Sequence, residues 1–447
     1  MFRNGAGAKG LDTTVAFYVS TQFFLKRMNL WNETKSIPIS HQMVWEAYKK
    51  VRANKGSGGI DAISMDEFDA NRSQYLYKLW NRMASGSYFP PPVKEVAIPK
   101  KDGKIRKLGI PTISDRVGQM VVKMYLEPRL EKIFSANSFG YRPNKSAHQA
   151  LEQVRENSWK TDWVIDLDIK GFFDNIDHNK LMLAVEKHTP EKWVQLYIKR
   201  WLEMPVLTKS GKLIQKQGKG TPQGGVISPL LANLFLHYAF DKWLENTDKT
   251  VCYSRYADDV IVHCKSEVQA KQLLKAIGER MKTVGLELHP QKTKIVYCRD
   301  YRRKGKYPIN KFEFLGYAFQ PRTTTPKKSN RLFLGFDCAI SIGSRKRIAE
   351  KLRTLKIESL SFKSIVGIAQ YLNPKIRGWV NYYGKFRASE LTKVFRLLSN
   401  RLVRWARRRY KRYKTSIRKA FKWLQRIREQ FPYLFHHWRY SFINVIA

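Results

Sequence analysis

The sequence predicts an α+β fold that ends in a separate, strongly basic helical region. Strand patterns alternate with helical patterns up to about residue 344, and a strand pair lies near the centre of the chain at 253–264. After residue 344 the strand patterns stop and helical patterns dominate. A length of 447 residues with 43% hydrophobic content is enough for several domains with buried cores.

The first half of the chain opens with helical patterns that alternate with a turn-rich segment over 41–83. Residues 90–111 predict a β-hairpin, because two runs with strand composition flank Asp102 and Gly103, a typical turn pair. A helix is predicted over 114–134.

The middle of the chain supplies the central strands. Residues 162–169 form a short apolar run that predicts a strand, and a Gly/Pro-rich loop precedes an amphipathic helix over 228–246. The segment 253–264 predicts a hairpin with "ADD" at its turn. A helix over 267–284 and a strand over 292–298 follow.

The charge of the chain indicates a polyanionic partner. Lys and Arg number 83 against 37 Asp and Glu, a formal net charge of +46, and nucleic acid is the usual partner of so basic a protein. No run of 18 apolar residues predicts a membrane span, and no signal peptide is recognisable. The four cysteines lack metal-ligand spacing, so we expect a reduced, cytoplasmic setting.

The basic charge is densest near the C-terminus. Within 401–414, eight of fourteen residues are Lys or Arg, with Trp405, Tyr410 and Tyr413 between them. We expect a basic helix there, and charges of one sign favour nucleic-acid binding over a merely solvated face. The candidate nucleic-acid-binding residues are Arg401, Arg404, Arg407, Arg408, Lys411 and Arg412.

Three carboxylates form the candidate catalytic group. Asp166 and Asp168 lie two apart on a predicted strand and therefore point to one face, and Asp168 ends the apolar run just before a turn. Asp168 could meet Asp258 and Asp259 of the central hairpin. Oxygen ligands of this kind suit Mg²⁺, and two such ions can activate an attacking hydroxyl and stabilise a leaving pyrophosphate. A surface turn whose aspartates face water is the alternative for "ADD" alone.

The order of these motifs resembles the group II intron reverse transcriptase/maturase family. The stretches that carry the resemblance are "DIKGFFDNIDH", "GTPQGGVISPLLANLFLH", "YADD", "GLELHPQKTKIVY", "FEFLGY", "NPKIRGWVNYYGKF" and "FPYLFHHW". The resemblance covers about residues 45–440. It implies a right-hand polymerase with fingers and palm, followed by a helical thumb/maturase domain.

The resemblance also implies a domain organisation. The expected parts are a weakly patterned N-terminal segment, an N-terminal extension with fingers, a palm, a connector and the thumb/maturase domain, at 1–40, 41–160, 161–320, 321–344 and 345–447.

Roles follow for individual residues of the matching motifs. Asp168, Asp258 and Asp259 would hold two Mg²⁺ ions. Phe173 would be a steric gate against the ribose 2′-hydroxyl, although it could instead be a core residue, whereas Phe172 is expected to pack inward.

Other residues would contact the nucleotide. Gln223 and Gly224 would lie along the incoming nucleotide and the template, where glycine permits close backbone approach. Lys100 and Arg106 of the fingers hairpin would grip the triphosphate, unless they are ordinary basic surface. Lys292 would donate a proton to the leaving pyrophosphate.

The implied activity is RNA-directed DNA synthesis from dNTPs on a primer 3′-OH, together with binding of intron RNA to assist splicing. The partners would be template or intron RNA, a DNA primer and target DNA, in a ribonucleoprotein. No cysteine follows Cys338, so we expect no endonuclease domain and priming from an existing 3′-OH. A splicing-only maturase and a domesticated relative in repair or phage defence remain the alternatives.

Overall fold

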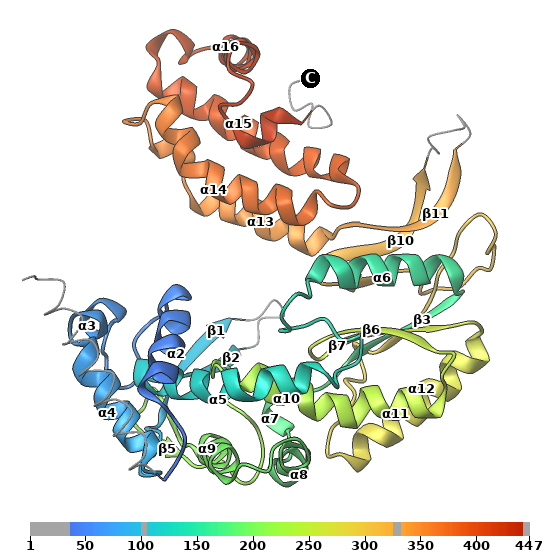
Figure 1. The fold of residues 1–447 in the computed structure, drawn as a ribbon. Coiled ribbons are helices and arrows are strands. Elements are labelled where there is room, and N and C mark those ends of the chain that lie inside the picture. The colour runs from blue at the N-terminus through green and yellow to red at the C-terminus, as the bar shows by residue number, and fades with distance from the viewer. Residues whose placement is uncertain (1–35, 100–104, 325–331, 441–447) are drawn as a thin grey trace, which may run out of the picture. The chain divides into compact units, whose positions relative to one another are not determined.

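The computed structural model describes residues 36–99, 105–324 and 332–440. The chain folds into two compact units, each built from separate stretches of sequence (Figure 1). The first unit comprises Met1–Phe134, Gly171–Asp241 and Val284–Leu286, and the second comprises Ser135–Lys170, Lys242–Thr283 and Glu287–Ala447.

The first unit is mostly helical and contains one small sheet of order β2-β1-β4-β5. Its helices are α2 (His41–Ala53), α3 (Met65–Ala70), α4 (Arg72–Ala84), α5 (Ile113–Glu131), α7 (Phe172–Asn175), α8 (His178–His188), α9 (Lys192–Glu203) and α10 (Ser228–Leu236). Its strands are β1 (Val93–Pro99), β2 (Ile105–Ile110), β4 (Val206–Leu207) and β5 (Leu213–Ile214). The predicted hairpin is confirmed by the antiparallel pair β1–β2, and its expected turn at Asp102 and Gly103 lies outside the described residues.

One predicted helix is interrupted. The expected helix over 228–246 consists of α10, a π-helix η1 (His237–Asp241) and α11 (Lys242–Thr247). The chain passes from the first unit to the second at the end of this π-helix, between Asp241 and Lys242.

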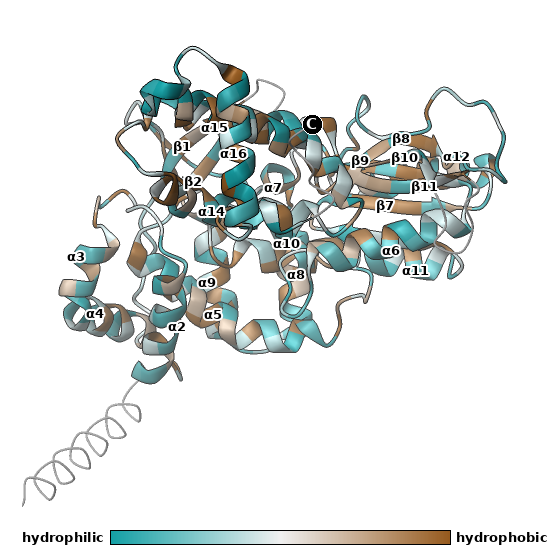
Figure 2. Cartoon of the chain, turned by 90° about the horizontal axis from the view of Figure 1, so that it is seen from above, coloured by the Kyte–Doolittle hydropathy of each residue, from teal (hydrophilic) through white to brown (hydrophobic). Residues whose placement is uncertain are grey.

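The second unit is built around an antiparallel sheet of order β6-β7-β3-β8. Its strands are β3 (Trp163–Asp168), β6 (Cys252–Tyr256), β7 (Asp259–Cys264) and β8 (Lys294–Tyr297). Helices α6 (Ala147–Lys160) and α12 (Glu267–Thr283) both contact β7, and Figure 1 shows them on opposite sides of the sheet. This cover explains why residues 260–264 are all buried, and Figure 2 shows β7 in the hydrophobic colour.

A second sheet of order β11-β10-β9 continues this unit, with β9 (Phe312–Phe314), β10 (Tyr317–Thr324) and β11 (Phe333–Ile340). The stacked rings of Phe312 and Phe319, 4.7 Å between centroids, belong to a core that also includes Val164 and Ile261 of the first sheet. The two sheets therefore share one hydrophobic core.

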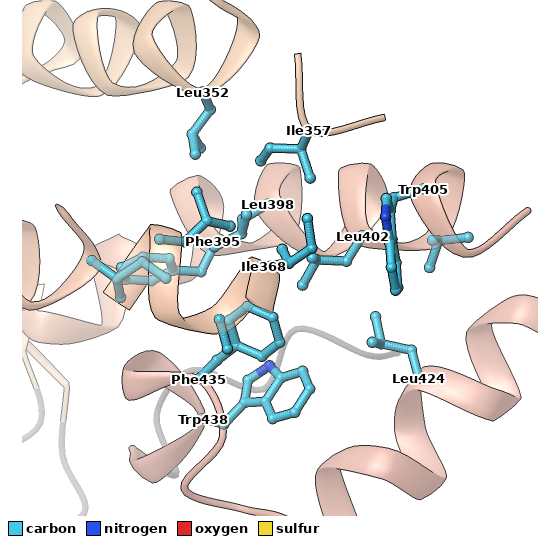
Figure 3. Packing of buried hydrophobic residues seen from close by; sticks show 14 of the residues in the cluster. Leu352, Ile357, Ile368, Phe395, Leu398, Leu402, Trp405, Leu424, Phe435 and Trp438 are labelled. Atoms are coloured by element: carbon cyan, nitrogen blue, oxygen red, sulfur yellow. The ribbon is translucent and has the colours of Figure 1, made fainter. Parts of the chain in front are cut away.

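The C-terminal part of the second unit is helical, as predicted. It contains α13 (Ile342–Thr354), α14 (Ile365–Tyr383), α15 (Thr392–Arg409) and α16 (Ile417–Gln430), with the 3-10 turns η2 (Ile357–Ser359), η3 (Ala388–Leu391), η4 (Lys411–Tyr413) and η5 (His436–Arg439). Figure 3 shows side chains from these helices packed around Leu398 and Leu402 of α15. The visible face of α16 is largely hydrophilic in Figure 2, as expected for an amphipathic helix at the surface.

The prediction of one helix over 401–414 was wrong. Helix α15 ends at Arg409, Tyr410 has extended backbone angles, and Lys411 and Arg412 lie in the separate turn η4. Trp405 and Tyr413 are buried, so these two aromatic rings belong to the core rather than to a base-stacking surface.

Side-chain caps fix where many of the helices begin. The hydroxyl or carboxylate of the cap residue accepts a hydrogen bond from a backbone amide of the first turn, which would otherwise lack a partner. Caps of this kind are Ser40, Ser64, Thr112, Ser146, Asp177, Ser341, Ser364 and Ser416.

Two sequence motifs of the C-terminal part meet through one side chain. Asn373 in "NPKIRGW" donates from Nδ2 to the Leu434 carbonyl at 2.9 Å, and its Oδ1 accepts from the His436 amide at 2.9 Å. The amide of Asn373 thus connects α14 to the "FPYLFHHW" segment.

Candidate functional site

Asp168 and Asp259 lie directly opposite each other in the second unit. Strands β3 and β7 pair in antiparallel register, with Asp168 facing Asp259 at the end of both strands. Side chains of directly opposed residues share one face of a sheet, with Cβ atoms about 5 Å apart. Asp258 occupies the two-residue turn between the paired residues Tyr256 and Asp259. The structure thus brings two of the three predicted carboxylates together, with the third in the adjoining turn.

Backbone contacts hold this turn, residues 257–258, in place. Ala257 has a left-handed φ of 59°, which a non-glycine residue adopts only under external constraint. The segment before α6 supplies that constraint. The Arg255 amide donates to the Asn137 carbonyl at 2.9 Å, and the Phe139 amide donates to the Arg255 carbonyl at 2.8 Å. A Cβ atom at Gly140 would lie only 2.5 Å from the Ala257 nitrogen, so glycine is required there.

Arg255 adds a side-chain contact to the same turn. Its guanidinium is fully buried and donates to the Ala257 carbonyl at 3.2 Å.

Lys292, the predicted proton donor, lies beside Asp168. Its Nζ is 3.4 Å from Asp168 Oδ2, and both side chains are about half exposed. The His289 amide donates to the Asp168 carbonyl at 2.7 Å, which fixes the loop that carries Lys292 against the end of β3.

Asp166 is less suited than Asp168 to bind a metal ion. Burial raises the pKa of Asp166 to about 7, while the opposing Lys294 lowers it and Asp168 raises it by smaller amounts. A carboxyl with that pKa is about half protonated at neutral pH, whereas metal binding needs the ionised form.

The donor set fits Mg²⁺ only in part. Among residues 36–99, 105–324 and 332–440, no group of three or more His, Cys, Asp or Glu side chains is arranged to hold a metal ion. Asp168 and Asp259 offer carboxylate oxygens on one face of the sheet, and the contact between Asp168 and the Lys292 ammonium shows that this carboxylate can engage a cation. Mg²⁺ is commonly held by one or two carboxylates completed by substrate phosphates, and these residues match that arrangement.

The first unit contains the predicted nucleotide-contacting loop, residues 220–227. The Thr221 amide donates to the Phe173 carbonyl at 2.8 Å, and the Gly109 amide donates to the Gln223 carbonyl at 3.0 Å. Gly224 has a φ of 135°, and a Cβ atom there would lie 2.6 Å from the Gly109 carbonyl oxygen. The loop therefore packs against β2 with no space for a side chain at Gly224.

Phe172 and Phe173 have different environments. Phe172 is buried, as predicted, and Phe173 is partly exposed with its ring 5.3 Å from the Phe172 ring. Partial exposure is compatible with a gate, because the ring is accessible to a ligand.

A hollow of about 260 Å³ lies beside this loop in the first unit. Its polar lining includes Gln223, Asp174, Lys107, Lys216 and Lys219. Burial lowers the pKa of Lys216 to about 8, and the nearby Asp174 acts in the opposite direction. The Lys216 ammonium donates to the Gly220 carbonyl at 3.1 Å.

The remaining nucleotide-contact candidates are on the β1–β2 hairpin. Arg106 lies on β2 opposite Ile98 with an exposed side chain. Lys100 lies outside the described residues.

The basic region of the second unit forms an open hollow of about 630 Å³. Arg404, Arg407 and Arg408 of α15 line it together with three cations that we did not predict, Arg353, Lys356 and Lys414. Glu358 is the one acidic residue in the lining. The hollow therefore presents six cations against one carboxylate.

Not all of the predicted nucleic-acid-binding residues line this hollow. Arg401 forms an ion pair with Glu358 at 2.7 Å, and Arg407 donates to the Lys414 carbonyl from Nε at 3.2 Å and from Nη2 at 2.9 Å. Arg407 is thereby held in a fixed position, whereas Lys411 and Arg412 lie outside the lining, in η4.

Comparison with known proteins assigns the family. The model of the reverse transcriptase (RNA-dependent DNA polymerase) family matches residues 98–337, more than half of the chain. The chain belongs to the reverse transcriptase family. The group II intron, maturase-specific domain matches residues 345–423. The predicted family, its reverse transcriptase fold with a helical C-terminal region, and the enzyme class of RNA-directed DNA polymerases are confirmed.

Two relatives illustrate the resemblance. Protein YkfC of Escherichia coli is 31% identical over 297 residues, which cover 57% of this chain and 77% of YkfC. The group II intron-encoded protein LtrA of Lactococcus lactis is 36% identical over 192 residues, which cover 43% of this chain and 32% of LtrA. This reverse transcriptase thus aligns with about a third of LtrA.

A solved telomerase is structurally similar at a low level. The telomerase from Candida albicans, solved with a fragment of telomeric RNA, has a TM-score of 0.44 and 13% identity, and the match covers 83% of this chain and 66% of that one.

None of the described helices combines the length and apolar character needed to cross a membrane.

The sequence alone did not identify residues that lie far from the motifs along the chain but next to them in the fold. Arg353 and Lys356 precede the dense basic run by about fifty residues, and only folding brings them to the same hollow. Gln119, which holds the backbone of the nucleotide loop, lies about a hundred residues before it. Spacing alone carries no signal for either contact.

Proposed function

We propose that this reverse transcriptase copies RNA into DNA by adding dNTPs to a primer 3′-OH. The observation that carries the proposal is the pairing of Asp168 with Asp259 at the ends of β3 and β7, with Asp258 in the adjoining turn. In the proposed reaction these three residues would hold Mg²⁺. Two such ions, when bound, would activate the primer hydroxyl and neutralise charge on the pyrophosphate that leaves.

Other side chains have proposed tasks in the same reaction. Lys292 would deliver a proton to the leaving pyrophosphate, because its ammonium lies 3.4 Å from the Asp168 carboxylate. Phe173 would exclude the ribose 2′-hydroxyl. Gln223 and Gly224 would contact the nucleotide and template, and Lys100 and Arg106 would contact the triphosphate.

The decisive experiment is primer extension on an RNA template with dNTPs and Mg²⁺. Asp258→Ala should lower the rate by more than about 100-fold, because loss even of outer-shell partners of metal ligands costs about 10- to 100-fold. Asp66→Ala, which removes an exposed carboxylate of α3, is the matched control and should keep the wild-type rate. Absence of extension by the wild type would favour the splicing-only maturase.

We further propose that the basic hollow binds the phosphates of structured intron RNA, so that the protein also assists splicing and intron mobility. The match of residues 345–423 to the maturase-specific domain and the six cations of the lining support this role. Backbone phosphates are the chemistry that such a hollow recognises, and binding should weaken as salt rises.

Charge-matched variants of α15 test the hollow. Arg404→Ala with Arg408→Ala removes two lining cations, whereas Arg396→Ala with Arg409→Ala removes two exposed cations of the same helix outside the lining. In a titration of a structured RNA hairpin, the first pair should reduce the slope of log affinity against log salt by about 1.5, since each phosphate contact contributes about 0.7–0.9. Equal reductions by both pairs would contradict a specific role for the hollow.

A further inference from the structure

A buried polar network lies beneath the nucleotide loop of the first unit. Asp115 of α5 is fully buried, and its carboxylate accepts three hydrogen bonds. Oδ1 accepts from Trp201 Nε1 at 2.7 Å and from the Tyr88 hydroxyl at 3.0 Å, and Oδ2 accepts from Gln119 Nε2 at 2.9 Å. Every partner of this carboxylate in the network is a donor.

Gln119 connects this carboxylate to the loop. Its Oε1 accepts from the Val226 amide at 2.7 Å and from the Ile227 amide at 3.3 Å, and the side chain is 1% exposed. A glutamine amide has one oxygen and one NH₂ group, so only one of its two orientations satisfies both sides. The acceptor at Asp115 therefore fixes the Gln119 oxygen toward the loop.

The loop is packed closely against this oxygen. A Cβ atom at Gly225 would lie 3.0 Å from Gln119 Oε1 and 2.6 Å from the Ser228 hydroxyl, which itself accepts from the Thr221 hydroxyl at 2.9 Å. With the bond from the Gly109 amide to the Gln223 carbonyl, the loop is held by β2 on one side and by α5 on the other.

We propose that Asp115 and Gln119 are positioning residues for the nucleotide loop. Asp115 sets the orientation of the Gln119 amide, and Gln119 holds the backbone at Val226 and Ile227, which in turn places Gln223 and Gly224. The consequence for dNTP binding rests on the proposed function of this loop, but the hydrogen-bond relay itself does not.

The relay predicts a specific rescue. Asp115→Asn keeps the acceptor for Trp201 and Tyr88 but presents an NH₂ group to the NH₂ group of Gln119. If the Gln119 amide turned over, its oxygen would accept from the introduced asparagine, but its NH₂ group would then face the amides of Val226 and Ile227. In either orientation, therefore, one hydrogen-bond donor faces another donor. Adding Gln119→Glu restores every bond, because the introduced asparagine then donates to one oxygen of the introduced glutamate, while the other oxygen accepts from the loop.

Hydrogen exchange of the full-length protein tests the relay without requiring activity. The amides of Val226 and Ile227 should exchange at least about tenfold faster in Asp115→Asn and in Gln119→Leu, and near the wild-type rate in the double variant Asp115→Asn/Gln119→Glu. Gln195→Leu, which removes a partly buried glutamine of α9 that donates to the Thr189 carbonyl, should leave these two amides unchanged. If Asp115→Asn does not fold, Gln119→Leu and the double variant still give the comparison.

Primer extension supplies the second measurement. The single variants should raise the KM for dNTPs at least about tenfold with a smaller change in kcat, and the double variant should recover the wild-type KM. Unchanged exchange at residues 226 and 227 in both single variants, or failure of the double variant to restore it, would overturn the proposal. If the wild type extends no primer, the proposed function fails while the exchange result still decides the relay.

Discussion

Two short segments carry most of the candidate chemistry, and they are held in different ways. The turn at 257–258 is held mainly by backbone: paired strands on both sides and the close approach of Gly140. The loop at 220–227 is held on one side by the buried side chains of Asp115 and Gln119. Both segments have a glycine that leaves no space for a Cβ atom, but only the loop also depends on the hydrogen-bonding groups of Asp115 and Gln119.

The largest effect should come from breaking the backbone contact. In Gly140→Ala the new methyl group would lie 2.5 Å from the Ala257 nitrogen and 3.0 Å from the Tyr256 carbonyl carbon, so the turn must move. Overpacking of this kind costs about 1–3 kcal/mol of stability, and displacement of reacting groups by about 1 Å can cost about 100-fold in rate. Primer extension and thermal unfolding measure both quantities.

A glycine with free space provides the control for this variant. Gly278 lies in the interior of α12, and beyond the neighbouring backbone of this helix no atom lies within 4 Å of an added Cβ. Gly278→Ala should therefore leave activity unchanged and stabilise the helix by about 1 kcal/mol. Wild-type activity in Gly140→Ala would show that the turn is not held by this contact.

An intermediate effect is expected at Phe173, whose carbonyl is bonded to the loop while its ring is partly exposed. Phe173→Ala keeps the backbone contact and removes the ring, so incorporation of ribonucleotides relative to dNTPs should rise by about 10- to 100-fold, the range typical of a steric pocket. Phe173→Tyr retains the ring and should keep the discrimination. Competitive single-nucleotide incorporation measures the ratio, and an unchanged ratio in Phe173→Ala would remove the residue from the gate role.

The last prediction concerns the pH dependence of stability, through the buried carboxyl of the loop network. Burial raises the pKa of Asp115 to about 6, which outweighs the hydrogen bonds from Trp201, Tyr88 and Gln119 that lower it. The folded state therefore binds a proton more tightly than the unfolded state, so the contribution of Asp115 to stability falls as pH rises from about 4 to 6 and is constant above that.

Urea unfolding at several pH values can isolate this contribution. The stability of the wild type relative to Asp115→Asn should fall by up to about 3 kcal/mol between pH 4 and pH 7, since each pKa unit corresponds to about 1.4 kcal/mol. Asp115 hydrogen-bonds within the loop network and not with the turn at 257–258, so this pH dependence of stability reports on the loop network. A pH-independent difference between the two proteins would contradict the raised pKa.

The same contrast explains how much the sequence could predict. The strand that ends at Asp168 and the hairpin around Asp258 were predictable, because apolar runs and a short turn specify them locally. The orientation of Gln119 toward Val226 was not, because it depends on tertiary contacts over a hundred residues. Helix α15 was predicted too long because residues 401–414 contain no Gly or Pro to end it. The helix ends where Tyr410 packs against the core beside Trp405.

The order of the strands in the sheet β6-β7-β3-β8 also has a consequence for synthesis of the chain. Strand β3 is made early, but its two neighbours in the sheet are β7, whose Asp259 follows Asp168 by 91 positions, and β8, which ends at Tyr297. A ribosome must therefore release nearly three hundred residues before this sheet can close, and pairing over such separations is slow. Until residue 264 has been made, the strand at 163–168 lacks both of its neighbours, and until residue 297 it lacks one of them. Open strand edges of this kind favour wrong pairing on a nascent chain, and such exposed surface is what chaperones protect.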